Sequence, residues 1–425
     1  MGMALEKPKL FPQRKTFVWF ASLLAILILL RLIFLYQNYQ DFISKPFYYT
    51  YATVLTSYEK TKYDKRYKVL KLKSLEGFTF YTTSHRKENF NHKRLRLQLF
   101  PNESIGFTDY LGTFYVKSKI KHQEKLPLTT KDTLLAYVKH QHSDASLASF
   151  YNAIFFATPL EVKLRDKIAL LGVSHLVALS GFHLGILWGL IYGFLLLLYR
   201  PLQQKFFPYR HALLDVGMVS MLLLGFYVWF VGAPPSLLRS YAMVLVGWSV
   251  LLMGMELLSF TFLLSVFLFL CVIFPGLLVS LSFWLSVAGV FYIFLLLQYT
   301  KTSNKWVITL VYIPVGIFVL MLPIVHTLFP VTSTYQLLSP LLSLLFIPFY
   351  PISMFLHLIG IGDVFDGYLI SLFRVPVEGE EHLLPLWAAF VYVLLSIAAI
   401  WQKKLFYVVL GLAVSYGVYV FMVLG

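Results

Sequence analysis

The sequence is short of charge and almost free of cysteine. Charged residues make up 13% of its 425 residues, about half of the roughly 25% found in ordinary soluble domains. Its single cysteine, Cys271, stands in an apolar run, so one chain can form neither a disulfide framework nor a cysteine metal site. A phosphate loop of the Gly-x-x-x-x-Gly-Lys-Ser/Thr type is also missing, which excludes ATP hydrolysis by that route.

Apolar residues are abundant instead, at 58% of the chain. A hydrocarbon core of about 30 Å is crossed by roughly 20 helical residues, and apolar runs of that length dominate the sequence after Ile168. The sequence therefore predicts a polytopic α-helical membrane protein. The expected spans are residues 17–36, 168–199, 212–231, 236–254, 259–274, 276–298, 306–325, 383–400 and 404–424.

Positive charge before the first span predicts the orientation of the chain. Most of the charged residues among positions 1–16 are basic. Basic segments that flank a transmembrane span stay in the cytoplasm. No small-residue cleavage site follows, so residues 17–36 are expected to be an uncleaved anchor. These features predict a multi-pass membrane protein with a cytoplasmic N-terminus, and the nine expected spans place the C-terminus on the opposite, extracytoplasmic side.

Two apolar stretches do not fit a single straight crossing. Residues 168–199 would form about 48 Å of helix, so we expect a break near Ser180 and Gly181. Three prolines interrupt residues 338–358, and a broken backbone at membrane depth is tolerated only beside protein or a water-filled path. This pattern favours a re-entrant pair of short helices there.

A region of alternating polar and apolar residues follows the anchor. Such alternation is typical of half-buried antiparallel strands, and about five runs occur, near residues 48–59, 67–74, 77–83, 93–100 and 112–121. We therefore expect a small extracytoplasmic β-barrel, similar to an OB-fold, at residues 45–125. An amphipathic helical connector is expected at 126–167, with an interfacial helix over Ser146 to Leu160, and a transmembrane channel domain at 168–425.

The expected barrel is basic. Residues 37–167 hold 22 Lys and Arg against 12 Asp and Glu, a net charge of +10. Cations interleaved with aromatic side chains are typical of surfaces that bind single-stranded nucleic acid, although a solvated basic face over an aromatic core has the same composition. The candidate DNA-binding residues are Lys71, Lys73, Arg94, Arg96, Tyr67, Phe80 and Tyr81.

Polar residues within the apolar runs form two clusters. Lipid-facing helices do not use such groups, so these side chains either pack helices together or line a polar path. Arg239 could also reach the outer interface. The candidate channel-lining residues are Ser174, His175, Ser180, Gly181, His183, Ser236 and Arg239.

Both clusters resemble sequence signatures of the ComEC competence family. Gly172-Val-Ser-His-Leu-Val-Ala-Leu-Ser-Gly-Phe-His183 is similar to its first signature, and Pro235-Ser-Leu-Leu-Arg-Ser-Tyr-Ala-Met243 is similar to its second. The resemblance implies an inner-membrane channel that passes single-stranded DNA into the cytoplasm during natural transformation. It also implies a periplasmic DNA-binding protein and a cytoplasmic motor or strand-binding proteins as partners, besides membrane lipid.

The chain departs from this family at one point. Many members continue into a metallo-β-lactamase-like domain, whose His-x-His-x-Asp-His pattern does not occur in this sequence. The nearest pattern, His140-Gln-His142, is interpreted as a solvated loop. We therefore expect no enzymatic activity, no metal and no cofactor.

Two other functions remain possible from the sequence alone. A secondary transporter for a small anionic solute would form its site from broken helices near Gly181, Pro235 and Pro340. An intramembrane serine hydrolase would pair Ser174 or Ser180 with a nearby histidine.

Overall fold

The computed structural model describes residues 11, 13–62, 65–86, 88–252, 259–300, 304–376 and 378–423, apart from a few side chains that include those of Ser236 and Arg239. These residues fall into two compact units. The sheet unit comprises Phe11–Thr133 and Leu264–Trp284, and the helical unit comprises Leu134–Leu263 and Leu285–Gly425.

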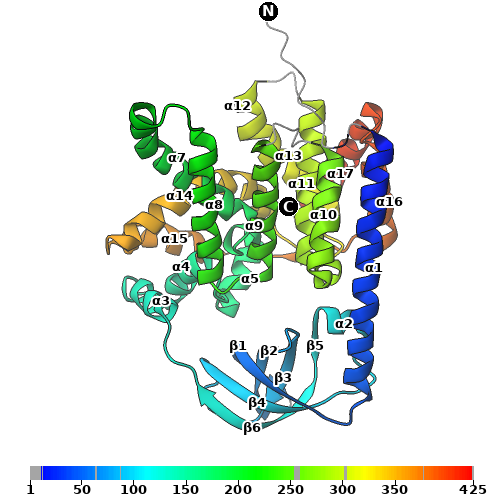
Figure 1. Cartoon of the computed structure of the whole chain (residues 1–425), viewed down its shortest axis with the longest axis vertical. Coiled ribbons are helices and arrows are strands. Elements are labelled where there is room, and N and C mark those ends of the chain that lie inside the picture. Colours follow the sequence, from blue (N-terminus) through cyan, green and yellow to red (C-terminus); the bar gives the residue numbers. More distant parts are fainter. Residues whose placement is uncertain are drawn as a thin grey trace, which may run out of the picture. The chain divides into compact units, whose positions relative to one another are not determined.

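The sheet unit begins with the long helix α1 (Arg14–Ser44) and continues into strands (Figure 1). The predicted period-two runs are confirmed as strands, and the last run divides into two at Val116. The strands are β1 (Tyr48–Lys62), β2 (Lys65–Ser74), β3 (Thr79–Ser84), β4 (Lys93–Phe100), β5 (Thr113–Tyr115) and β6 (Lys117–Lys125), with α2 (Phe107–Leu111) before β5.

The six strands form one sheet in the order β5-β3-β2-β1-β4-β6. Its two edges, β5 and β6, are separated in sequence by Val116 alone, so the sheet must curl back on itself at that residue. Val116 N–H donates to the Tyr81 carbonyl (2.9 Å), and the Thr82 and Ser118 hydroxyls are hydrogen-bonded at 2.8 Å. The ladder nevertheless stays open, because β6 pairs with β4 and not with β3. The predicted closed five-stranded barrel is therefore replaced by a curled six-stranded sheet.

Alternate residues of the strands build the core of this unit. Leu95, Leu97 and Leu99 of β4 are fully buried, while the residues between them are not. Phe42, near the end of α1, is buried in the same cluster. The end of α1 is thus part of the folded sheet unit, which fits a helix that is about 46 Å long and exceeds a 30 Å hydrocarbon core.

The remaining helices follow in chain order. The first group is α3 (Thr130–His140), α4 (Ala145–Phe156), α5 (Val162–Leu170), α6 (Ser174–Val177), α7 (Gly181–Phe206), α8 (Ala212–Phe230), α9 (Pro235–Leu252) and α10 (Phe260–Ile273). The second group is η1 (Pro275–Val279), α11 (Leu281–Tyr299), α12 (Lys305–Val307), η2 (Ile308–Tyr312), α13 (Ile313–Val325), η3 (Thr334–Leu338), α14 (Ser339–Leu358), η4 (Gly362–Phe365), α15 (Asp366–Arg374), α16 (Leu386–Ala398) and α17 (Lys403–Val423). The short strands β7 (Val331–Thr332) and β8 (Glu380–Glu381) pair with each other.

Within the described residues, seven helices are long and apolar enough to cross a membrane. The predicted break near Ser180 and Gly181 is confirmed, because α7 begins at Gly181 and α6 ends at Val177. The predicted re-entrant pair at 338–358 is wrong. Pro348 and Pro351 lie inside one continuous helix, α14, because a proline in an apolar helix can be accommodated by neighbouring helices and local adjustment.

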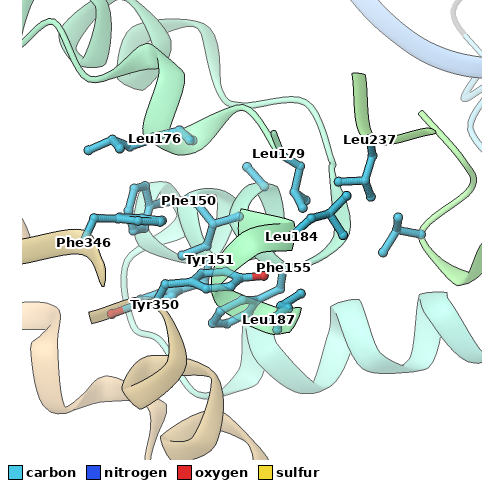
Figure 2. Close-up of a cluster of buried hydrophobic side chains, with 14 of the residues drawn as sticks. Phe150, Tyr151, Phe155, Leu176, Leu179, Leu184, Leu187, Leu237, Phe346 and Tyr350 are labelled. Atoms are coloured by element: carbon cyan, nitrogen blue, oxygen red, sulfur yellow. The ribbon is translucent and has the colours of Figure 1, made fainter. Parts of the chain in front are cut away.

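Helix α4 lies in the core of the helical unit (Figure 2). Seven of its twelve residues are buried, including the aromatic residues Phe150, Tyr151 and Phe155. Figure 2 shows these side chains together with Phe346 and Tyr350 of α14. A helix that is apolar on most sides packs inside a protein, so α4 is a core helix of this unit, and the interfacial position of residues 146–160 stays a prediction.

Candidate functional site

One face of the sheet carries basic side chains in register. Thr53 of β1 pairs with Lys73 of β2 and with Arg94 of β4, and Lys73 pairs with Thr79 of β3. Registered partners project from the same side of a sheet, so Lys73 and Arg94 lie in one row across four strands. The core lies on the other face, because the neighbouring Leu95 is fully buried.

The adjoining rows place cations over aromatic rings. Arg96 pairs with Tyr51, and its guanidinium carbon lies 5.9 Å from the Tyr49 ring centre and 5.8 Å from that of Tyr51. Lys71 pairs with Tyr81, whose ring centre is 5.7 Å from the ammonium nitrogen. Tyr49 and Tyr51 are 47% and 42% exposed. Both rings are therefore open to a ligand while the cation–π contacts orient them.

A shallow pocket of about 400 Å³ opens beside Tyr81. Its lining consists of Tyr67, Thr83, His85 and Tyr115. Tyr115 pairs with Tyr81 across the parallel β3–β5 ladder, and its hydroxyl is 3.0 Å from the Thr83 hydroxyl. Aromatic rings with hydrogen-bonding groups at their edge are suited to receive a nucleobase. We call the following set the aromatic–basic face: Tyr49, Tyr51, Tyr67, Lys71, Lys73, Tyr81, His85, Arg94, Arg96 and Tyr115.

The loop that carries His85 is tied to strand β6. The Glu88 carboxylate accepts hydrogen bonds from Gln123 Nε2 (2.8 Å) and Lys93 Nζ (3.4 Å). The hydrogen bond from Gln123 has the largest effect and the one from Lys93 follows, and both lower the pKa of Glu88. The carboxylate is therefore charged at neutral pH, and the loop keeps its attachment there.

Phe80 is the one predicted DNA-binding residue that the structure removes from this face. Its side chain is fully buried in the core of the sheet unit. Because Thr79 and Tyr81 point outward, the residue between them must point inward. The sequence analysis missed Tyr49, Tyr51, His85 and Tyr115. The same alternation in β1, which sets Tyr49 and Tyr51 two residues apart, could have identified the first two.

The segment between α5 and α7 forms the second candidate region. Gly172 ends α5 with a φ of +70°, a left-handed conformation that favours glycine. The Gly172 N–H donates to the Ala169 carbonyl (3.0 Å), and the Val173 N–H donates to the Ile168 carbonyl (3.2 Å). A Cβ at Gly172 would lie 3.1 Å from the side chain of Gln336. The backbone of this segment is therefore closely packed against η3.

Helix α14 holds the same segment through hydroxyl groups. Ser339 Oγ donates to the Gly172 carbonyl at 3.0 Å. His175 Nε2 and Ser343 Oγ are hydrogen-bonded at 3.1 Å. Gln336, just before α14, donates to the Val331 carbonyl at 3.1 Å and to the Ala169 carbonyl at 3.4 Å. The sequence analysis did not identify these partners, because they lie more than 150 residues away in the chain.

The start of α7 is capped by the two polar residues of its own first turn. The Ser180 N–H donates to His183 Nδ1 (3.3 Å), which satisfies a backbone group at the helix end. His183 is fully buried, with its ring edge-on to Phe346 (5.1 Å) and Tyr350 (4.9 Å) of α14. A Cβ at Gly181 would lie 3.3 Å from Ser240 Oγ of α9. Ser174 and His175, in contrast, are exposed.

The family model described as "Competence protein" matches residues 159–419, which include this entire region. The chain belongs to the competence protein family. No curated protein and no solved structure matches it. Membership together with the seven long apolar helices of the described part identifies a multi-pass membrane protein with a role in competence, and therefore in DNA uptake.

In this competence protein, both histidines of the first signature have serine partners. Ser343 Oγ–H donates to the Ser339 carbonyl (2.7 Å), so His175 must donate its own Nε2–H to Ser343 instead of accepting a proton. His183 Nδ1 lies 3.3 Å from both the backbone nitrogen and the hydroxyl oxygen of Ser180. Both histidines therefore take part in hydrogen bonds within the helical unit, and the Ser180 hydroxyl is among the partners of His183.

The second signature of the competence protein is only partly described. Ser236 and Arg239 lie in α9 by their backbones, and their side chains are outside the described part of the structure. Among the described residues there is no group of three or more His, Cys, Asp or Glu placed to hold a metal ion.

Proposed function

We propose that this competence protein is the channel through which single-stranded DNA crosses the inner membrane. The observation that carries the proposal is the aromatic–basic face, where cations and exposed rings alternate across neighbouring strands. Strands lie about 4.8 Å apart, so the rows offer closely spaced partners for successive phosphates and bases. A sheet that curls back on itself is also close to the OB-like arrangement of single-strand binders.

The direction of transport follows from the predicted orientation. With the N-terminus in the cytoplasm, α1 carries the chain outward, and the sheet unit receives the strand from a periplasmic DNA-binding protein. The helical unit then provides the membrane passage. A phosphate loop for ATP is missing from the sequence, so a cytoplasmic motor or strand-binding proteins supply the pulling force.

The secondary-transporter alternative has less support than it had from the sequence. That function was expected to use a helix broken at Pro340, but α14 begins one residue earlier, at Ser339, and runs unbroken to Leu358. Proline in the first turn of a helix is well tolerated. The expected helix break at Pro340, one of three that would form the transporter's substrate site, is therefore an ordinary helix start.

Deletion of the gene in its host tests the channel proposal directly. Fluorescent double-stranded DNA should still accumulate in the periplasm, because the earlier uptake step is left in place. Transformants should fall below detection, since no strand reaches the cytoplasm, and a plasmid copy of the gene should restore them. Unchanged transformation would exclude the channel function and make a small-anion transporter the leading alternative.

A further inference from the structure

Three side chains from distant segments meet at a buried site in the helical unit. His142 Nδ1 lies 2.9 and 3.0 Å from the two carboxylate oxygens of Asp366, at the start of α15. His142 Nε2 lies 2.9 Å from Nε2 of His357, in the last turn of α14. The His142 side chain is completely buried, and that of Asp366 is 14% exposed. The predicted solvated loop at His140-Gln-His142 is therefore wrong for His142.

The hydrogen bonds fix most of the protons in this cluster. His357 Nδ1 lies 2.6 Å from the Ser353 carbonyl, and a carbonyl oxygen only accepts, so Nδ1 carries a hydrogen. An ionised Asp366 also only accepts, so His142 Nδ1 carries a hydrogen as well. Two neutral imidazoles would then direct two lone pairs at each other across 2.9 Å. One further proton between the two Nε2 atoms converts that repulsion into a hydrogen bond.

Moving this proton from one group of the cluster to another does not change the number of protons that the cluster holds. If Asp366 is protonated, it donates to His142 Nδ1, and His142 donates its Nε2–H to His357. In both arrangements the three groups hold one proton more than an ionised aspartate with two neutral histidines, and their total charge is zero. Without that proton, a buried site would carry one uncompensated negative charge, which is costly in a low-dielectric interior.

A proton fits this site better than a metal ion. Two imidazole nitrogens bound to a tetrahedral zinc ion at about 2.05 Å stand roughly 3.3 Å apart. The observed separation is 2.9 Å, which is an ordinary hydrogen-bond length. The Asp366 carboxylate contacts Nδ1 of His142 and not the two Nε2 atoms. In the described part of the chain, no group of three or more His, Cys, Asp or Glu is placed to hold a metal ion.

The groups around the cluster come from every element that packs against it. The Tyr151 ring of α4 is stacked on His142 (ring centres 4.6 Å apart, planes at 8°) and lies 4.4 Å from the His357 ring. Asp363 of η4 is a second carboxylate close to His357. The charged or titratable groups that face the pair are therefore Asp363, Asp366 and Tyr151, and none of them is a cation.

We propose that His142, His357 and Asp366 form a proton-binding site, and that the bound proton fastens the loop before α4 to the end of α14. Gln141 makes the second half of this attachment. It donates to the His357 carbonyl (3.1 Å) and accepts from the Gly362 N–H (2.8 Å). Helix α14 contacts the first signature at its other end through Ser339 and Ser343. Release of the proton therefore loosens the helix that holds the signature in place.

The sign of the pH effect follows from the proton count. In the closed state, in which His142, His357 and Asp366 are hydrogen-bonded to one another, the cluster holds one extra proton. In the open state, in which water surrounds these side chains, the cluster loses that proton once the pH exceeds about 6.5, the ordinary pKa of histidine. The closed state thus binds more protons above that pH. Each further pH unit should raise the opening equilibrium constant about tenfold, until the closed cluster itself releases its proton. Below that range, protonation of both histidines favours the open state instead.

Hydrogen–deuterium exchange of the full-length protein in lipid nanodiscs tests the site. Protection of the Gly362 amide, corrected for intrinsic exchange, should fall about tenfold per pH unit between pH 6.5 and 8.5. In His142→Gln, the side-chain amide can donate to His357 without titrating, so protection should become independent of pH. His140→Gln makes the same chemical change two residues earlier and should behave like the wild type. Asp366→Asn supplies permanently the donor that a protonated Asp366 would supply to His142 Nδ1, so protection in this variant should also become independent of pH.

Three outcomes would overturn the proposal. A pH dependence that is the same in the wild type and in His142→Gln would place the titrating group elsewhere. A wild type whose Gly362 protection does not change with pH would exclude the bound proton. Protection that rises with micromolar zinc and falls with a chelator, only when His142 is present, would identify a metal ion in place of the proton. DNA is absent from this experiment, so its result is independent of the channel proposal.

Discussion

Replacing Tyr49, Tyr51 and Arg96 together with alanine is expected to lower the affinity of the full-length protein for a single-stranded oligonucleotide by about 100-fold or more. Each base stacked on an aromatic side chain contributes roughly 1–3 kcal/mol, and the variant removes two rings together with the cation that orients them. Fluorescence anisotropy with an oligothymidine at fixed salt concentration measures the loss. The three side chains are exposed or lie on the outer face, so the fold should be retained.

The matched control is Lys125→Ala, which removes one positive charge from the same sheet. Lys125 pairs with Lys93, so it projects from the side opposite Arg94 and should leave affinity nearly unchanged. Arg96→Ala alone should also reduce the salt dependence, by about 0.7 in the slope of log K against log salt concentration if one phosphate contact is lost. Equal losses in the triple variant and the control would show that binding follows net charge and not the aromatic–basic face.

The sequence predicted the strands well because alternation is a local signal. The buried Leu95, Leu97 and Leu99 are two residues apart, and that spacing alone identifies β4 and its inner face. The same rule could have excluded Phe80, which has outward neighbours on both sides. It could not show that Arg94 and Lys73 share a row, because the register between strands depends on pairings across the whole sheet.

The partners of the signature segment were beyond sequence reasoning for a similar reason. The break before Gly181 is local, since a 32-residue apolar run exceeds the membrane thickness. The contacts of Ser339, Ser343 and Gln336 are tertiary and leave no periodic signal. His142 was misjudged because no further ligand stands near it in the sequence, whereas its environment is made by Asp366 and His357, more than 200 residues later.

Replacing Gly172 with alanine is expected to reduce transformation at least tenfold while leaving the protein in the membrane. An alanine at φ +70° is strained by about 1–3 kcal/mol, and its Cβ would stand 3.1 Å from Gln336. That cost is smaller than a typical total stability of 5–15 kcal/mol. It is relieved most easily when the signature segment moves away from η3 and loses the Ser339 hydrogen bond.

Gly185→Ala provides the control for Gly172→Ala, because it makes the same change in α7, where an added Cβ has no neighbour within 4 Å. Transformation by this variant should match the wild type, with both proteins present at equal levels in membrane fractions. If both glycine variants transform normally, the close packing of the segment is not required for transport. If Gly172→Ala fails while Ser174→Ala succeeds, the signature acts by holding a backbone position against α14 and not by presenting the Ser174 hydroxyl to the strand. Failure of Ser174→Ala alone would instead favour the exposed Ser174 hydroxyl as part of the path.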